Sequence, residues 1–110
     1  MSIDIERTQA LQAIEQQLQQ VQVHKQTLRG KILELESAVN AVKDSKTVYK
    51  AIGNVLVQKD STVLTKELEE EKEKLSLRFT TFEKQETKLQ DKRKELQDEI
   101  RKKIEGGKHE

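Results

Sequence analysis

Residues Thr47–Asp60, TVYKAIGNVLVQKD, decide the fold, because this stretch differs from both of its charged flanking segments. Two runs rich in strand-forming residues surround Gly53-Asn54, which is the pattern of a β-hairpin with a short turn. Glycine tolerates a positive φ angle, and asparagine tolerates it better than most residues. We therefore predict a hairpin over residues 47–60, with strands near Val48–Ile52 and Val55–Lys59.

The predicted hairpin is apolar on both faces, whereas a lone hairpin in water is only marginally stable. Its two strands therefore require other protein to cover them, and this need is the main functional clue in the sequence. The apolar residues of the stretch are Val48, Tyr49, Ala51, Ile52, Val55, Leu56 and Val57.

The composition of the chain favours long helices over a rounded core. Only 33% of the 110 residues are hydrophobic and 3% are aromatic, while 37% are charged. This is too little apolar material for a globular interior but enough for a narrow seam between two helices. The chain contains no proline, so nothing interrupts a very long helix. We expect a single domain over residues 1–110.

Several classes of partner and location are disfavoured by the sequence. The net charge is +1, which gives no basic stripe for nucleic acid. The absence of cysteine leaves no disulfide framework and no thiol nucleophile. No apolar run reaches the roughly 18 residues of a membrane span. The first residues, MSIDIERTQA, lack the basic start and apolar segment of a secretory signal, so we expect a cytoplasmic protein.

The segment before the hairpin predicts one helix over residues 2–44, because its apolar residues recur every three and four positions. Lys25 interrupts this seam, and its side chain has two interpretations. It lies over the seam and reaches water, which is the simpler interpretation, or it fixes the register of the partner helix. The apolar seam residues are Leu11, Ile14, Leu18, Val21, Leu28, Ile32, Leu35, Val39 and Val42.

The segment after the hairpin predicts a second helix over residues 62–105, capped by Asp60, Ser61 or Thr62. We expect Gly106-Gly107 to end it and residues 106–110 to form a frayed tail. Its apolar residues recur every seven positions, at Leu68, Leu75, Phe82, Leu89 and Leu96. The companion seam positions are Lys72, Phe79, Glu86, Arg93 and Ile100, so this seam is narrower than the first.

Two helices of similar length joined by a short insert predict a mostly α fold, a long antiparallel two-helix coiled coil with the hairpin at its closed end. The open end then carries isoleucines that the seam does not clearly use. They are either ordinary apolar residues near helix ends or a small patch for weak contacts with other apolar chains. The candidate residues of this patch are Met1, Ile3, Ile5, Ile100 and Ile104.

Catalytic chemistry finds little support in the sequence. His24 and His109 are the only histidines, and we interpret both as surface residues that lack the partners of a catalytic or metal site. Gly53 is a turn glycine rather than part of a phosphate-binding loop. We therefore expect no enzyme activity, no cofactor and no metal.

The order of helix, hairpin and helix, with VYK at Val48–Lys50 and GNVLV at Gly53–Val57, resembles the prefoldin β class. The start of the second helix, LTKELEEEKEKLSLRFTTFEKQE at Leu64–Glu86, is similar to the C-terminal helix of that family. The hairpin and second helix most resemble archaeal β subunits, and a eukaryotic β-class homologue is the alternative. The α class carries two hairpins between its helices, and this chain has room for one.

The resemblance implies a hexamer of two α-class and four β-class subunits whose hairpins join into a β-barrel platform. The helix ends would hold unfolded proteins without ATP and pass them to a group II chaperonin, so that the tips meet client, chaperonin or both. The seven apolar hairpin residues would be assembly residues, and the five residues of the open end would contact clients. The alternative is a structural coiled-coil module that dimerises or tethers other proteins.

Overall fold

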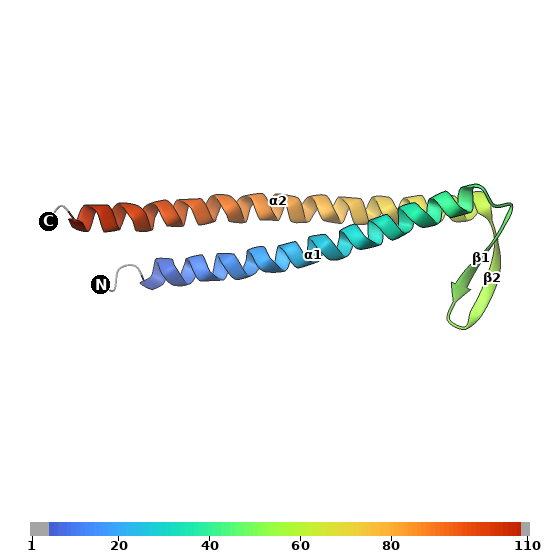
Figure 1. The fold of residues 1–110 in the computed structure, drawn as a ribbon, viewed down its shortest axis with the longest axis horizontal. Helices are drawn as coiled ribbons and strands as arrows, with labels where there is room; N and C mark the ends of the chain where they lie inside the picture. Colours follow the sequence, from blue (N-terminus) through green and yellow to red (C-terminus); the bar gives the residue numbers. More distant parts are fainter. Residues whose placement is uncertain (1–4, 109–110) are drawn as a thin grey trace. The chain divides into compact units, whose positions relative to one another are not determined.

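The computed structural model describes residues 5–108, with side chains described as far as Gly106. The elements follow the order α1 (Ile5–Lys43), β1 (Thr47–Ile52), β2 (Val55–Asp60) and α2 (Ser61–Lys108), as Figure 1 shows. The expected mostly α architecture, with two long helices flanking one antiparallel hairpin in the described chain, is confirmed. Residues 2–4 of the predicted first helix lie outside the described residues, and α1 ends at Lys43 instead of residue 44.

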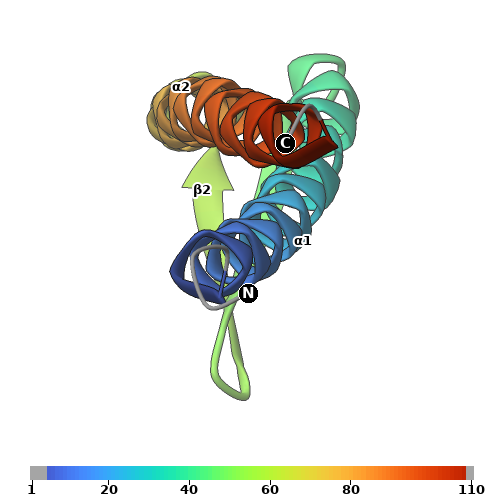
Figure 2. The same ribbon diagram turned by 90° about the vertical axis from the view of Figure 1, so that its left-hand side faces the viewer.

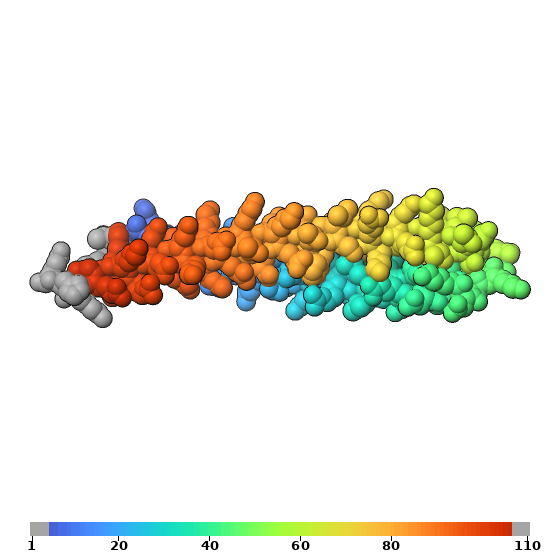
Figure 3. Space-filling view, turned by 90° about the horizontal axis from the view of Figure 1, so that it is seen from above, coloured from blue at the N-terminus to red at the C-terminus, as the bar shows by residue number. Residues whose placement is uncertain are grey.

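The chain forms two compact units, and both helices contribute to each of them. The terminal unit comprises residues 1–25 and 81–110, and the hairpin unit comprises residues 26–80. In each unit α1 and α2 run antiparallel. Residues with higher numbers in α2 contact residues with lower numbers in α1. Within the hairpin unit, Figure 3 shows the side chains of α1 (cyan to green) packed against those of α2 (yellow).

The two strands of the hairpin pair in the register expected for a two-residue turn at Gly53-Asn54. Ile52 pairs with Val55 next to the turn, and Thr47 pairs with Asp60 at the base. Gly53 has a φ of 60°, which places glycine at the first central position, as in a type II′ turn that matches the twist of the strands. Figures 1 and 2 show the turn lying away from the helices of the hairpin unit.

Both junctions between the helices and the hairpin are held by local hydrogen bonds. The backbone N–H of Thr62 donates to Oδ1 of Asp60 over 2.9 Å, which confirms the predicted cap of α2. At the end of α1, the hydroxyl of Ser45 donates to the carbonyl of Ala41 over 3.2 Å. The N–H of Ser45 donates to the carbonyl of Val42 over 3.1 Å, so carbonyls of the last turn have partners.

The predicted end of the second helix at residue 105 is wrong, because α2 continues through Gly106 and Gly107 to Lys108. Gly53 is the one described glycine with positive φ, so neither Gly106 nor Gly107 adopts the left-handed cap that ends many helices. Glycine weakens a helix by about 1 kcal/mol relative to alanine but does not forbid it. Of the predicted tail, residues 109–110 lie outside the described residues.

Five of the six buried core residues among the described residues lie along the predicted seam of α1, and the sixth, Leu64, belongs to α2. The core residues in the terminal unit are Ile14, Leu18 and Val21, and those in the hairpin unit are Leu28, Val39 and Leu64. The heptad leucines and Phe82 of α2 are only half-buried, as the narrower second seam predicts. Leu64 is a core residue that the seven-residue repeat does not predict, although it lies one turn before Leu68 and continues the same face.

Candidate assembly and binding surfaces

The hairpin presents large apolar side chains to solvent. The cross-strand pairing places Tyr49, Ala51 and Leu56 on one face, and alternation places Val48, Ile52, Val55 and Val57 on the other. Tyr49 is 61% exposed and Leu56 is 70% exposed. The described residues leave most of both side chains uncovered, so the hairpin is an exposed apolar surface of the hairpin unit.

One carboxylate of α2 links both strands to the helix. Glu67 accepts from Nζ of Lys59 over 3.3 Å, and its other oxygen lies 3.8 Å from Nζ of Lys50. Lys50 belongs to β1 and Lys59 to β2, and both project from the face that carries Val57. This contact orients that face toward α2, whereas the face with Tyr49 and Leu56 makes no such link.

The second candidate surface is a hollow of about 320 Å³ in the terminal unit. Ile100 and Ile104, both predicted client contacts, line it together, and Leu11 of α1 joins them. Ile104 is 52% exposed. Polar chains form the remaining wall, at Gln97, Arg101 and Glu105. The hollow is therefore a shallow apolar surface with a polar rim, and we call it the terminal patch.

The other predicted residues of this end are not all part of the terminal patch. Ile5 is 55% exposed but does not line the hollow. Met1 and Ile3 lie outside the described residues. Nearby, Nε of Arg7 donates to Oε2 of Glu99 over 2.9 Å and joins the two helices close to the patch. The apolar repeat predicts Leu11 as a seam residue alone, and only its neighbours on α2 show that it also lines this surface.

A larger hollow of about 400 Å³ lies elsewhere in the terminal unit, between Val21, His24, Phe82 and Leu89. Gln17, Gln20, Gln85 and Lys88 complete its walls. The ring of His24 stacks on Phe82, with ring centres 5.0 Å apart and planes inclined by 8°. His24 is exposed, as predicted, but one side of its imidazole is used in this contact, which the sequence pattern did not indicate.

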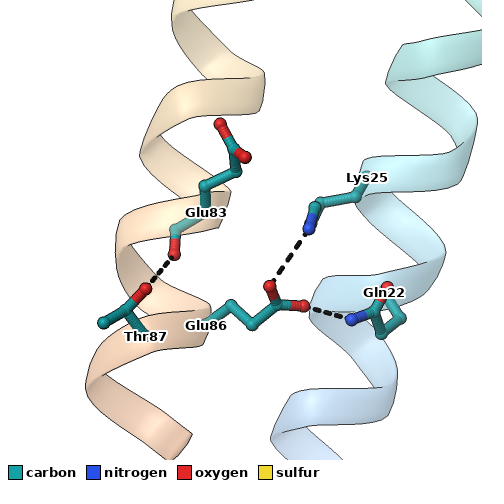
Figure 4. A network of polar contacts seen from close by, with 5 residues as sticks. All are labelled: Gln22, Lys25, Glu83, Glu86 and Thr87. Atoms are coloured by element: carbon teal, nitrogen blue, oxygen red, sulfur yellow. Dashed lines mark hydrogen bonds and ion pairs between the residues drawn. The ribbon is translucent and has the colours of Figure 1, made fainter.

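A polar cluster occupies the seam of the terminal unit where Lys25 interrupts it (Figure 4). Nζ of Lys25 donates to Oε1 of Glu86 over 3.1 Å, and the amide of Gln22 donates to the other oxygen of Glu86. The side chains of Lys25 and Glu86 are only 16% and 15% exposed. The favoured interpretation of Lys25 as a residue that reaches water is therefore wrong, because a carboxylate at a seam position of α2 binds it instead.

The described residues 5–108 offer no recognisable centre for metal binding. Among them, no three His, Cys, Asp or Glu side chains gather closely enough to hold a metal ion. His109 lies outside this range. No helix in the same range is sufficiently long and apolar to cross a membrane.

Comparison with known proteins gives a consistent result. A family profile described as "Prefoldin subunit" matches residues 6–107. Prefoldin subunit beta of Saccharolobus islandicus is 38% identical over 95 residues, covering 81% of this chain and 73% of the relative. That of Archaeoglobus fulgidus is 36% identical over 93 residues, covering 82% and 80%. The crystal structure of the prefoldin beta subunit from Thermococcus strain KS-1 superposes with a TM-score of 0.84, 31% identity and 88% coverage of each chain.

Proposed function

Because this chain belongs to the prefoldin family as a β-class subunit, we propose that it assembles through its hairpin and holds unfolded proteins at its helix ends. Prefoldin subunits are chaperones rather than enzymes, and the family forms hetero-oligomers. The finer assignments concern which residues join subunits, which residues meet clients and what the complete particle contains. The proposed assembly residues lie in the hairpin unit and the described client residues in the terminal unit, so these two assignments can be tested separately.

The observation that carries the proposal is the exposed apolar hairpin. A side chain such as Leu56, left 70% exposed on a two-stranded sheet, favours association with further protein. Both outer strand edges also offer backbone groups to additional strands. We assign the seven apolar hairpin residues to assembly with α-class and other β-class subunits. The assembly is a β-barrel platform in a particle of two α and four β subunits.

The terminal patch is the proposed client surface. It is shallow and apolar, which suits weak contact with many different unfolded chains better than tight contact with one ligand. Several such patches in one particle raise the effective concentration of each further contact, so many weak contacts replace one strong contact. Ile100 and Ile104 belong to the patch, and we extend the client surface beyond it to Ile5 and to Met1 and Ile3. The particle holds unfolded clients in the cytoplasm without ATP. It then transfers them to a group II chaperonin.

The mass of the assembled particle tests the first assignment. The chain is mixed with an α-class partner and examined by light scattering after size separation. A discrete mixed hexamer is the expected result. A stable dimer that ignores the α subunit would instead identify a structural coiled-coil module, the competing function for this fold.

Substitutions that leave the hairpin intact test the client surface. The variant Ile100→Ser/Ile104→Ser, reassembled with the α partner, should form the hexamer but lose much of its suppression of aggregation of a denatured client. Lys102→Ser/Lys103→Ser provides the matched control, since both lysines are exposed on the same turns of α2. Equal light scattering by the two variants would remove Ile100 and Ile104 from the client surface.

A further inference from the structure

The second seam row of α2 is mostly polar, yet the members of this row find partners on α1 at regular intervals. Each step of seven residues up α2 is matched by a step of seven down α1. In the hairpin unit, Lys72 lies 3.2 Å from Glu36, and the guanidinium of Arg29 lies 5.3 Å from the ring of Phe79. In the terminal unit, Glu86 accepts from Gln22, and Arg93 lies 3.5 Å from Glu15.

These four contacts are individually weak, with one exception. The Arg93–Glu15 and Lys72–Glu36 pairs are substantially exposed, and such pairs contribute little to stability. Glu86 differs, because Lys25 supplies a second contact and both side chains are largely buried. An ion pair in this position is often no more stabilising than an apolar pair of similar size. The row therefore requires an explanation other than the stability of the folded chain.

Partner choice supplies that explanation. When two copies of α2 lie parallel and in register, each seam residue faces its own copy. Lys72 then meets Lys72, Glu86 meets Glu86 and Arg93 meets Arg93, and like charges forced together at a seam cost several kcal/mol. Two parallel copies of α1 bring Lys25 against Lys25 in the same way. The antiparallel pairing of α1 with α2 gives each of these charges an opposite or neutral partner.

We propose that the polar seam row of α2, together with Lys25, is a pairing code that accepts α1 and rejects a second copy of α2 lying parallel and in register. Polar seam residues that select a coiled-coil partner at some cost in stability follow the same physical logic. The code keeps the helices of neighbouring subunits from joining into one coiled coil. Association between subunits is thereby left to the hairpin.

The test removes three of these four charges and keeps the apolar residues of the seam. The apolar-row variant carries Lys25→Leu, Glu86→Leu and Arg93→Leu. The swapped variant carries Lys25→Glu with Glu86→Lys and Glu15→Arg with Arg93→Glu, so the Lys25–Glu86 and Arg93–Glu15 pairs keep their partners with reversed sign. The chain has no cysteine, so Gln97→Cys in each background provides one site for a spin label. Two α2 helices in contact, with axes about 10 Å apart, then give a short distance between the labels of two copies.

We expect the apolar-row variant to unfold at the same temperature as the wild type or higher. Its helices should self-associate at least ~10-fold more tightly, with a short label-to-label distance that is absent from the wild type. The swapped variant should behave like the wild type. The proposal is overturned if the apolar-row variant associates no more tightly than the wild type, or if the swapped variant associates equally. Loss of helical circular dichroism in the apolar-row variant would also overturn it, since the charges would then be needed for folding.

Discussion

The hairpin and the seam of α1 are both rich in Val, Leu and Ile, but their surroundings in the folded chain are opposite. Leu18 and Leu28 of the seam are buried against α2 in their respective units, whereas Leu56 of the hairpin is 70% exposed. The seam therefore completes its packing within one chain. The hairpin is a folded element whose apolar side chains, apart from the half-buried Val48, are left exposed by the described residues of its own chain.

This difference separates two kinds of apolar residue that composition alone treats as equal. Burying a large aliphatic side chain contributes about 1.5–3 kcal/mol, and the seam gains this on folding of the single chain. The hairpin can gain it only on association. Substitutions in the seam should therefore change unfolding, and substitutions on the hairpin should change assembly.

The largest expected effect is on the hairpin. Tyr49→Ser/Leu56→Ser removes two exposed apolar residues of one face, so the helical content of the isolated chain should stay unchanged. Binding to the α-class partner should weaken roughly 100-fold or more, because buried anchors dominate interface energies. Titration calorimetry measures this affinity. Gln58→Ser, on the same face, should bind normally, and equal weakening by this control would contradict the assignment of Tyr49 and Leu56.

The next largest effect is on the seam. Leu18→Ala should lower the free energy of unfolding by about 3 kcal/mol, since it removes a buried side chain and leaves a cavity. Urea denaturation followed by circular dichroism measures the loss. Leu33→Ala, at a position 55% exposed, should change it by about 0.5 kcal/mol. Similar losses at both positions would show that burial of Leu18 contributes nothing specific.

A smaller effect is expected at the joint between the hairpin and α2. Asp60→Ala removes the acceptor for the N–H of Thr62 and should lower the free energy of unfolding by about 1 kcal/mol. Asp60→Asn keeps an oxygen in the same place and should be nearly neutral. Thermal melts of the two variants give the comparison, and a loss in the Asn variant as large as in the Ala variant would argue against capping.

The smallest effects, of opposite sign, are expected at two glycines. Gly30 lies within α1, and a methyl group there would meet no described atom within 4 Å, so Gly30→Ala should stabilise the chain by about 0.5–1 kcal/mol. Gly53 has a φ of 60°, so Gly53→Ala should destabilise it by about 1 kcal/mol. Differential scanning calorimetry should show the two melting temperatures shifting in opposite directions. If both melting temperatures shifted in the same direction, the backbone conformations of Gly30 and Gly53 would not explain the changes in stability.

Much of the fold could be predicted because its causes are local. The two-residue turn follows from Gly53. Each strand of the hairpin is one residue longer than predicted, so that β1 begins at Thr47 and β2 ends at Asp60. The seam of α1 follows from a repeat visible within a few turns of helix. The end of α2 was predicted less well, because a glycine pair lowers helix stability without excluding a helical backbone.

The two candidate surfaces also differ in how far they could be predicted from the sequence. The exposed hairpin residues could be named from their pattern, because a two-stranded sheet has no interior of its own. The terminal patch could be predicted only in part. Ile100 and Ile104 were recognisable as residues that the seam did not use, but Leu11 joins them because α1 and α2 meet at that level.

The sequence by itself determined the order of elements, the apolar face of α1, the turn and the exposure of the hairpin, because each depends on residues only a few positions apart. The tertiary structure alone decided which polar side chains meet. Lys25 and Glu86 are separated by 61 residues, and Arg7 and Glu99 by 92. Such pairs depend on the register of two antiparallel helices, in which a shift of one residue changes every partner. The seam cluster around Glu86 forms only when that register is fixed. The link from Glu67 to both strands depends instead on how the hairpin packs on the start of α2.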